Sequence, residues 1–168
     1  MTSFYSTKKY GHDRGLSAAF RQWRAESHCK YMHGYSLEFE FVFGAHELDG
    51  NNWVVDFGGL KELELWLRQN FDHKTLVALD DPMYPAFEDM HEKGIIDMVS
   101  VESTGCEMFA NMAMEFASGM IQDEYDGRCW VESVTVREHG SNSATCRLSL
   151  IHISSPRDLS SSRMPSSA

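Results

Sequence analysis

The chain has 168 residues, of which 42% are hydrophobic and 24% charged, and its formal net charge is −10. This length and composition predict a soluble globular domain with a real core, and the acidic balance argues against nucleic acid or an anionic membrane as partner. No apolar run is long enough for a membrane span, and the first residues have no signal-peptide core.

The first predicted elements are two strands. Residues 16–23 place Leu16, Ala18 and Phe20 on one face of a strand. Residues 35–43 form the clearest strand of the chain, because polar and apolar side chains alternate along it. The apolar face of this second strand consists of Tyr35, Leu37, Phe39, Phe41 and Phe43.

Two helices are predicted between the strand pairs. Apolar side chains recur at helical spacing in residues 58–71 and again in residues 107–122. The second helix begins with a predicted capping box at residues 104–107. The intervening residues 80–101 are less regular, with a short helix that ends at Gly94 and an edge strand as the interpretation.

Two further alternating strands are predicted at residues 130–138 and 145–153, joined by a turn. The order of strands and helices favours an α+β domain, an antiparallel sheet with two helices on one face. Residues 1–153 are expected to form this single domain. Residues 154–168 contain seven serines and two prolines and are expected to be a disordered tail.

The four cysteines are widely spaced and include no CxxC pair, which indicates reduced thiols and a cytoplasmic protein. Cys29 is the candidate for reactivity, because it lies four residues before His33. The alternative for Cys29 is a buried cysteine beside a turn, and the other three are expected to be small buried hydrophobes.

Two acidic positions complete the candidate residues. Asp72 precedes His73 after the first helix, and a carboxylate beside a histidine favours a general base, although a helix C-terminus also attracts histidine. Glu138 shares the face of its strand with Val134 and Val136, where a carboxylate needs a partner such as the N–H groups of a ligand. The alternative for Glu138 is a strand-end side chain turned into water. No phosphate-binding loop, HExxH helix or serine elbow is present.

In chain order, these motifs resemble one family. Cys29 before "HGY", "VVDF", "DHKTL", "STGCE" and "VTVREH" are similar to the 6-pyruvoyl and 6-carboxy-tetrahydropterin synthases, from about residue 16 to residue 146. The resemblance implies a tunnelling fold, in which the sheets of several subunits join into a barrel. It further implies a homohexamer of two stacked trimers, with active sites at subunit interfaces and dihydroneopterin triphosphate or a related pterin as substrate. The family's products serve biopterin or queuosine biosynthesis.

The resemblance also implies roles for individual residues. Cys29, Asp72 and His73 match the residues that move protons, and Glu138 matches the anchor of the pterin ring. Glu107 matches a glutamate at the start of the second helix, although the predicted capping box also explains it.

The family's zinc ligands are only partly matched. The three histidine positions read Phe20, His33 and Tyr35 here, so His33 is the one retained ligand. Zinc sites in enzymes normally have three protein ligands, and zinc binding is therefore doubtful in this chain. His28 or His139 is a replacement ligand to consider, and Tyr35 is expected to hydrogen-bond the ligand instead. No nucleotide cofactor is expected.

Three functions remain open from the sequence. The first is a pterin-side-chain lyase, favoured by the retained Cys29, Asp72, His73 and Glu138. The second is a non-catalytic oligomer that binds a pterin- or purine-like ligand, favoured by the missing zinc ligands. The third is a structural oligomer in which these residues only pack.

Overall fold

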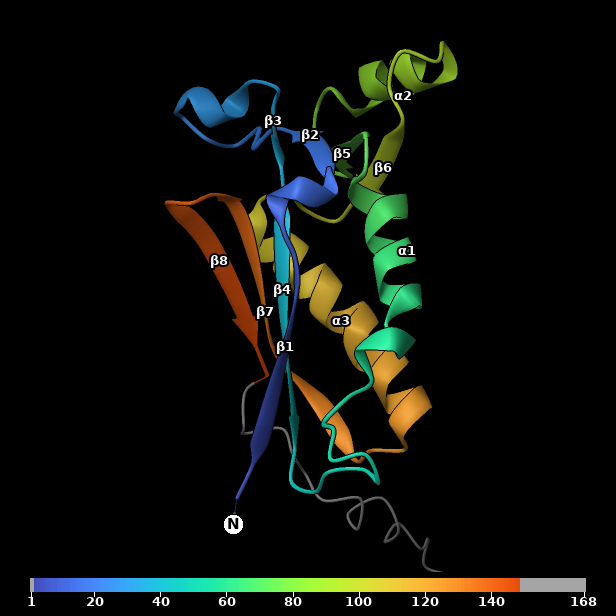
Figure 1. The fold of residues 1–168 in the computed structure, drawn as a ribbon. Helices are drawn as coiled ribbons and strands as arrows, with labels where there is room; N and C mark the ends of the chain where they lie inside the picture. The colour runs from blue at the N-terminus through green and yellow to red at the C-terminus, as the bar shows by residue number, and fades with distance from the viewer. Residues whose placement is uncertain (1, 149–168) are drawn as a thin grey trace, which may run out of the picture.

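A computed structural model describes residues 2–148 of the chain, and Figure 1 shows its fold. These residues form eight strands and three α-helices, with short 3₁₀ turns between some of them. In chain order the elements are β1 (Phe4–Tyr10), β2 (Ser17–Phe20), β3 (His33–Ser36), β4 (Glu38–Ala45), α1 (Lys61–Phe71), β5 (Lys74–Ala78), α2 (Tyr84–Glu92), β6 (Met98–Val101), α3 (Cys106–Tyr125), β7 (Cys129–His139) and β8 (Asn142–Arg147).

The strands form two four-stranded sheets. The larger sheet has the order β1-β4-β7-β8, and every neighbouring pair in it is antiparallel. The smaller sheet has the order β3-β2-β5-β6, with β3 antiparallel to β2 and with β5 parallel to both of its neighbours. The predicted α+β class is confirmed. The smaller sheet, which contains parallel pairs, is an addition to the predicted architecture.

The predicted strand 35–43 is wrong as a single element. It divides into β3 and β4, which pair in different sheets, and Leu37 lies between them. The Leu37 amide donates a hydrogen bond to the Leu16 carbonyl at 2.9 Å, so this amide remains paired where the backbone passes from one sheet to the other. The predicted apolar face nevertheless holds, because Leu37, Phe39 and Phe41 are all fully buried.

The core lies between the larger sheet and two helices. Figure 1 shows α1 and α3 on the same side of this sheet. The ring of Phe39 packs 4.7 Å from that of Phe71 at the end of α1, and Phe71 packs 5.6 Å from Phe109 of α3. Each such side chain contributes roughly 1.5–3 kcal/mol on burial, so this face holds the two helices on the sheet.

Residues 80–101 contain the two elements that the sequence only suggested. The helix α2 is followed by Gly94 in the left-handed region, with a φ of 71°, and β6 is an edge strand of the smaller sheet. Strands β1 and β5 were not predicted. Within residues 2–148, no helix is long and apolar enough to cross a membrane. The predicted tail, residues 154–168, lies outside the described residues.

Candidate functional site

Four aromatic rings gather where the smaller sheet meets the end of β7. Phe20 pairs with His33 across β2 and β3, and Ala18 pairs with Tyr35, so Phe20, His33 and Tyr35 share one face. The ring centroids lie 5.0 Å apart for Phe20 and His33, 5.7 Å for His33 and Tyr35, and 6.3 Å for Phe20 and Tyr35. His139 of β7 adds a fourth ring, 6.0 Å from Tyr35. We call these four residues the ring cluster.

The ring cluster does not offer the ligands of a zinc site. Phe20 has no donor atom, is 1% exposed, and packs edge-on against Phe109 at 5.0 Å. Among residues 2–148, no three His, Cys, Asp or Glu side chains gather in an arrangement that could hold a metal ion. The donor set therefore does not fit the zinc that the family resemblance implies.

The two histidines of the cluster present different groups. The Nδ1 atom of His33 lies 2.7 Å from the carbonyl oxygen of Tyr31, so Nδ1 donates and Nε2 keeps its lone pair. The Nδ1 atom of His139 accepts from the Ser141 amide at 3.2 Å, so in the neutral ring Nε2 carries the proton. His33 thus offers an acceptor beside Tyr35, and His139 offers a donor.

Glu138 lies in an irregularity of β7. Arg137 pairs with Ser143 and His139 pairs with Asn142, which leaves Glu138 as the extra residue of a β-bulge. The negative charge of Glu138 acts on the thiol of Cys106, the first residue of α3. Burial raises the pKa of Cys106 to about 12, and Glu138 adds to the shift. The half-buried carboxylate therefore faces the start of α3.

Tyr35 connects Glu138 with Cys29. Burial is the largest cause that raises the pKa of the Tyr35 hydroxyl, and the charges of Glu138, Cys29 and Cys106 follow in that order. All three groups must lie near the phenol to have this effect, because charge interactions fade with distance. The charges of Cys29 and Glu138 thus reach the Tyr35 hydroxyl, and the ring of Tyr35 lies 6.0 Å from that of His139, the residue after Glu138.

Cys29 is held in a short turn next to β2. It lies in the 3₁₀ turn His28–Lys30, where the Ser27 side chain accepts from the Cys29 amide at 3.3 Å. The Cys29 carbonyl accepts from the Gln22 amide at 2.9 Å, which holds this turn against the residues after β2. Cys29 is half-buried, whereas Cys106 and Cys129 are buried.

We expect Cys29 to be the most reactive of the four thiols. Burial raises the pKa of Cys106, Cys129 and Cys146, and a higher pKa leaves less of the nucleophilic thiolate. Limiting iodoacetamide at pH 7.5 followed by peptide mass spectrometry should find label on Cys29 first, by about tenfold or more. Earlier labelling of any other cysteine would contradict this order.

The predicted capping box at the start of α3 is wrong. Gly105 is the N-cap residue, with a φ of 117° and no side-chain cap, and the Thr104 hydroxyl donates to the Arg21 carbonyl at 2.7 Å instead. The positive φ at position 105 favours glycine, and a Cβ there would also require the flexible end of the Gln22 side chain, at 2.6 Å, to shift. Glu107 is exposed and makes no capping bond, so the capping explanation that competed with its binding role is removed.

Asp72 and His73 form a pair at the end of α1. Asp72 Oδ1 lies 2.6 Å from His73 Nδ1, and Arg68 binds the other carboxylate oxygen at 3.1 Å. The bond to His73 and then the bond to Arg68 hold the pKa of Asp72 below its usual value. His73 adopts a left-handed φ of 57°, and its side chain is 88% exposed.

The Asp72–His73 pair stands apart from the other predicted residues. Within residues 2–148, no hydrogen bond or ion pair joins Asp72 or His73 to Cys29 or Glu138. A non-glycine residue in the left-handed region costs free energy, and such strain gathers at functional positions. The His73 ring is therefore held through Nδ1 by Asp72, while most of its side chain is exposed to solvent.

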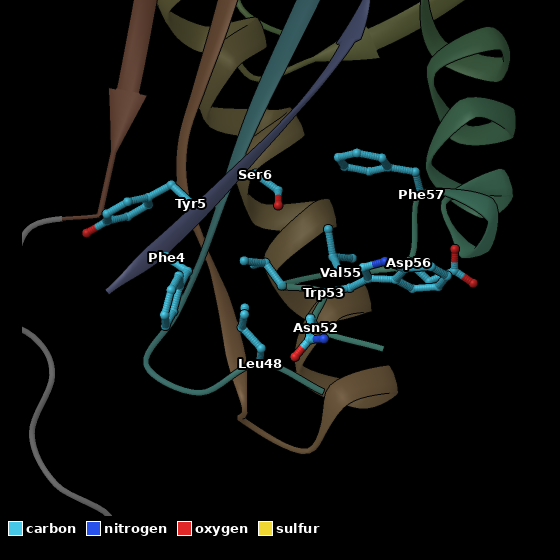
Figure 2. A pocket seen from close by; sticks show the side chains of 10 residues that line it. Phe4, Tyr5, Ser6, Leu48, Asn52, Trp53, Val55, Asp56 and Phe57 are labelled. Carbon is cyan, nitrogen blue, oxygen red and sulfur yellow. The ribbon is translucent and has the colours of Figure 1, made fainter. Parts of the chain in front are cut away.

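Two cavities flank these elements. One of about 350 Å³ lies beside the start of α3 and the residues after β2, and is lined in part by Gln22, Arg24 and Thr104. Figure 2 shows a larger cavity of about 460 Å³ between β1 and residues 48–57. Its half-exposed side chains include Phe4, Trp53 and Phe57, and it contains none of the predicted site residues.

Cys106 lies in the hydrophobic core, 7% exposed, as expected for a small buried hydrophobe. Sequence reasoning did not predict that the charge of Glu138 contributes to the raised pKa of its thiol. The two residues lie far apart in the chain, so no local pattern relates them.

The fold and the ordered motifs define an α+β chain of the pterin-synthase class. The chain belongs to the 6-pyruvoyl tetrahydropterin synthase family, whose model matches residues 11–149. It is 32% identical over 89 residues to the 6-carboxy-5,6,7,8-tetrahydropterin synthase of Aquifex aeolicus. This alignment covers 52% of this chain and 55% of that protein. It is 33% identical over 57 residues to the enzyme of the same name from Rickettsia conorii. This alignment covers 33% of this chain and 41% of that protein. The matched region thus spans about half or less of these relatives.

Solved structures show the same fold. An uncharacterized protein of Wolinella succinogenes superposes with a TM-score of 0.75 at 17% identity, covering 88% of this chain and 99% of that one. The 6-pyruvoyltetrahydropterin synthase of Plasmodium vivax gives a TM-score of 0.65 at 16% identity, covering 87% and 98%. At these identities the likeness concerns the fold.

Proposed function

We propose that the protein is a pterin-side-chain lyase that acts on dihydroneopterin triphosphate or a related pterin without a zinc ion. The observation that carries this proposal is the packing of Tyr35 6.0 Å from His139, the residue after Glu138, and the charges of Glu138 and Cys29 both act on the Tyr35 hydroxyl. A thiol, a phenol and a carboxylate from three separate elements are more than packing requires, and perturbed groups that share one place favour a functional site.

Each group has a role that fits its chemistry. The Glu138 carboxylate accepts two parallel N–H bonds from the pyrimidine edge of the ligand, as carboxylates do with amidine-like groups. Cys29 takes a proton from the ligand's side chain or returns one, since a thiol is an effective acid and base near neutral pH. Glu107, exposed at the start of α3, is assigned a second contact with the ligand, and its charge acts on Cys106, as does that of Glu138.

The Asp72–His73 pair acts on the site of a neighbouring copy in this proposal. Its exposed histidine and its lack of a bond to Cys29 within residues 2–148 support an arrangement between subunits. Strands β1 and β8 are the outer strands of the larger sheet, and unpaired strand edges need covering. We therefore propose a homohexamer built by pairing these edges into a barrel. A stable particle of 19.2 kDa in light scattering would contradict it.

One observation favours a second candidate, a non-catalytic oligomer that binds a pterin- or purine-like ligand. Phe20 is buried at a position where the family resemblance implies a zinc ligand. The polarisation of the oxygens on the ligand's side chain by a metal ion is therefore lost. Incubation with dihydroneopterin triphosphate, followed by chromatography of the products, separates the two candidates. Loss of the side chain or of the triphosphate supports the lyase, whereas recovery of bound, unchanged ligand supports the binding oligomer.

Glu138→Gln should lower the affinity for neopterin at least tenfold. The amide keeps the size of the side chain but replaces one acceptor oxygen with a donor, which opposes the N–H groups of the ligand. Calorimetry of wild type and variant measures this loss. Glu132→Gln is the matched control, because Glu132 lies on the same strand and its carboxylate accepts a hydrogen bond from the Trp130 indole N–H at 2.8 Å. Equal affinity of wild type and Glu138→Gln would remove Glu138 from the site.

A further inference from the structure

The place where the family resemblance implies a metal is closed by the ring cluster. Phe20 fills one ligand position with a hydrocarbon ring held between His33 and Phe109, at 5.0 Å from each. Moving this ring aside would open a cavity in a packed region, at a cost of several kcal/mol. A ligand in this site therefore meets an apolar wall on the Phe20 side, and the polar groups must come from the other members of the cluster.

Tyr35 is the polar group at the centre of the cluster. Its ring lies between those of His33 and His139, at 5.7 Å and 6.0 Å. The side chain is half-buried, and no group within residues 2–148 forms a hydrogen bond with its hydroxyl. A phenol held by its neighbours but without a partner at its oxygen is ready to bind an incoming group.

The neighbours of Tyr35 set the direction of such a bond. The charges of Glu138, Cys29 and Cys106 act on the phenol and favour the neutral hydroxyl as a donor. His139 adds a second donor at Nε2 in the neutral ring, because its Nδ1 accepts from the Ser141 amide. The two rings lie 6.0 Å apart, so these two donors belong to neighbouring side chains, which suits an oxygen atom of the ligand.

We infer that Tyr35, assisted by His139, takes the place of the metal by donating hydrogen bonds to an oxygen atom on the ligand's side chain. This inference rests on the proposed function and narrows it. The substrates are pterins whose side chain carries a hydroxyl or carbonyl oxygen near the ring, and the site holds this oxygen without chelating it. Because a single oxygen is enough for two donors, the site does not require the pair of adjacent oxygens that a metal chelates.

Two ligands test this inference by calorimetry. Neopterin carries hydroxyl groups on its side chain, and pterin is the same bicyclic ring without a side chain. Tyr35→Phe removes only the hydroxyl and should weaken neopterin about tenfold while leaving pterin unchanged, since one buried hydrogen bond is worth about that much. Glu138→Gln should weaken both ligands. Wild type treated with EDTA should bind neopterin as before.

Tyr31→Phe is the matched control, because Tyr31 is an exposed tyrosine close to Tyr35 in the sequence. It should change neither affinity. An unchanged affinity of Tyr35→Phe for neopterin, or an equal loss for both ligands, would overturn the inference and leave the proposed function standing. Loss of neopterin binding after EDTA would overturn it in favour of a metal. If wild type binds neither ligand, the proposed function fails and the inference fails with it.

Discussion

Replacing Phe20 and Tyr35 together by histidine is expected to create a zinc site. Three imidazoles bound to one tetrahedral zinc at Zn–N distances of about 2.1 Å have ring centroids roughly 5 Å apart. The rings of Phe20, His33 and Tyr35 already lie 5.0, 5.7 and 6.3 Å from one another. His33 also keeps the hydrogen bond from Nδ1 to a carbonyl that orients a metal-binding histidine, which leaves Nε2 for the metal.

Elemental analysis after gel filtration measures the outcome. The double variant should retain about one zinc per subunit and wild type well under one, because wild type has one histidine and one phenol at positions 20, 33 and 35. Each single variant should retain little zinc, since two histidines do not complete the ligand set. Adding His33→Ala to the double variant is the control and should abolish binding. Stoichiometric zinc in wild type would contradict the prediction and identify His28, His139 or a neighbouring copy as a ligand donor.

The sequence predicted those elements whose side chains alternate cleanly. The apolar residues of α1 recur at helical spacing, and Leu63, Leu67 and Phe71 are fully buried as expected. Strand β1 was missed because Ser6 and Lys8 occupy its core-facing positions, so that no apolar face is visible in the sequence. Strand β5 was missed because Thr75 to Ala78 are all buried, as in a strand with parallel neighbours, which removes the alternation.

The division of residues 35–43 into two strands was not readable from periodicity. The alternation runs through Leu37 without a break, because the same face remains buried on both sides of the change of sheet. What differs is the pairing partner, β2 before Leu37 and β1 after it, and pairing is a long-range property. A turn residue such as glycine or proline would have marked the boundary, but none is present here.

The candidate site was predictable as a set of residue types and only partly as an arrangement. The positions of Cys29, Tyr35 and Glu138 in ordered motifs pointed to one site, and the charges of Cys29 and Glu138 act on the Tyr35 hydroxyl in the structure. The bulge at Glu138 and the effect of Glu138 on the Cys106 thiol depend on how β8 and α3 pack against β7, which no local pattern encodes. The opposite case is His73, whose place beside Asp72 was expected from the sequence, whereas the 88% exposure of its side chain was not.

Arg21→Met is expected to lower the free energy of unfolding by about 3–5 kcal/mol, the usual cost of leaving a buried charge without its partner. The Asp81 side chain is 2% exposed and receives two bonds from Arg21, at 2.8 and 2.5 Å. Arg21 directly follows Phe20, and its carbonyl accepts from Thr104 before α3. The variant should therefore loosen the support of the candidate site as well as the fold.

The pH dependence of this loss follows from the pKa of Asp81. The hydrogen bond from Arg21 is the largest cause that holds this pKa below its unfolded value of about 3.9. A depressed carboxyl pKa contributes stability that is fully present above the unfolded pKa and disappears as pH falls through the folded one. The gap in unfolding free energy between wild type and Arg21→Met should therefore be constant from pH 7 to about pH 5 and shrink below pH 4.

Urea denaturation across this pH range measures the gap, and Arg24→Met is the matched control. Arg24 and Asp80 also lie 2.5 Å apart, but their side chains are 64% and 46% exposed. Water screens such a pair, so its loss should change the unfolding free energy little at any pH. If Arg21→Met and Arg24→Met were equally stable, the Arg21–Asp81 bond would contribute no more than a surface pair. The buried carboxylate of Asp81 would then have to be stabilised by the hydrogen bond that it accepts from the Met83 amide at 2.8 Å.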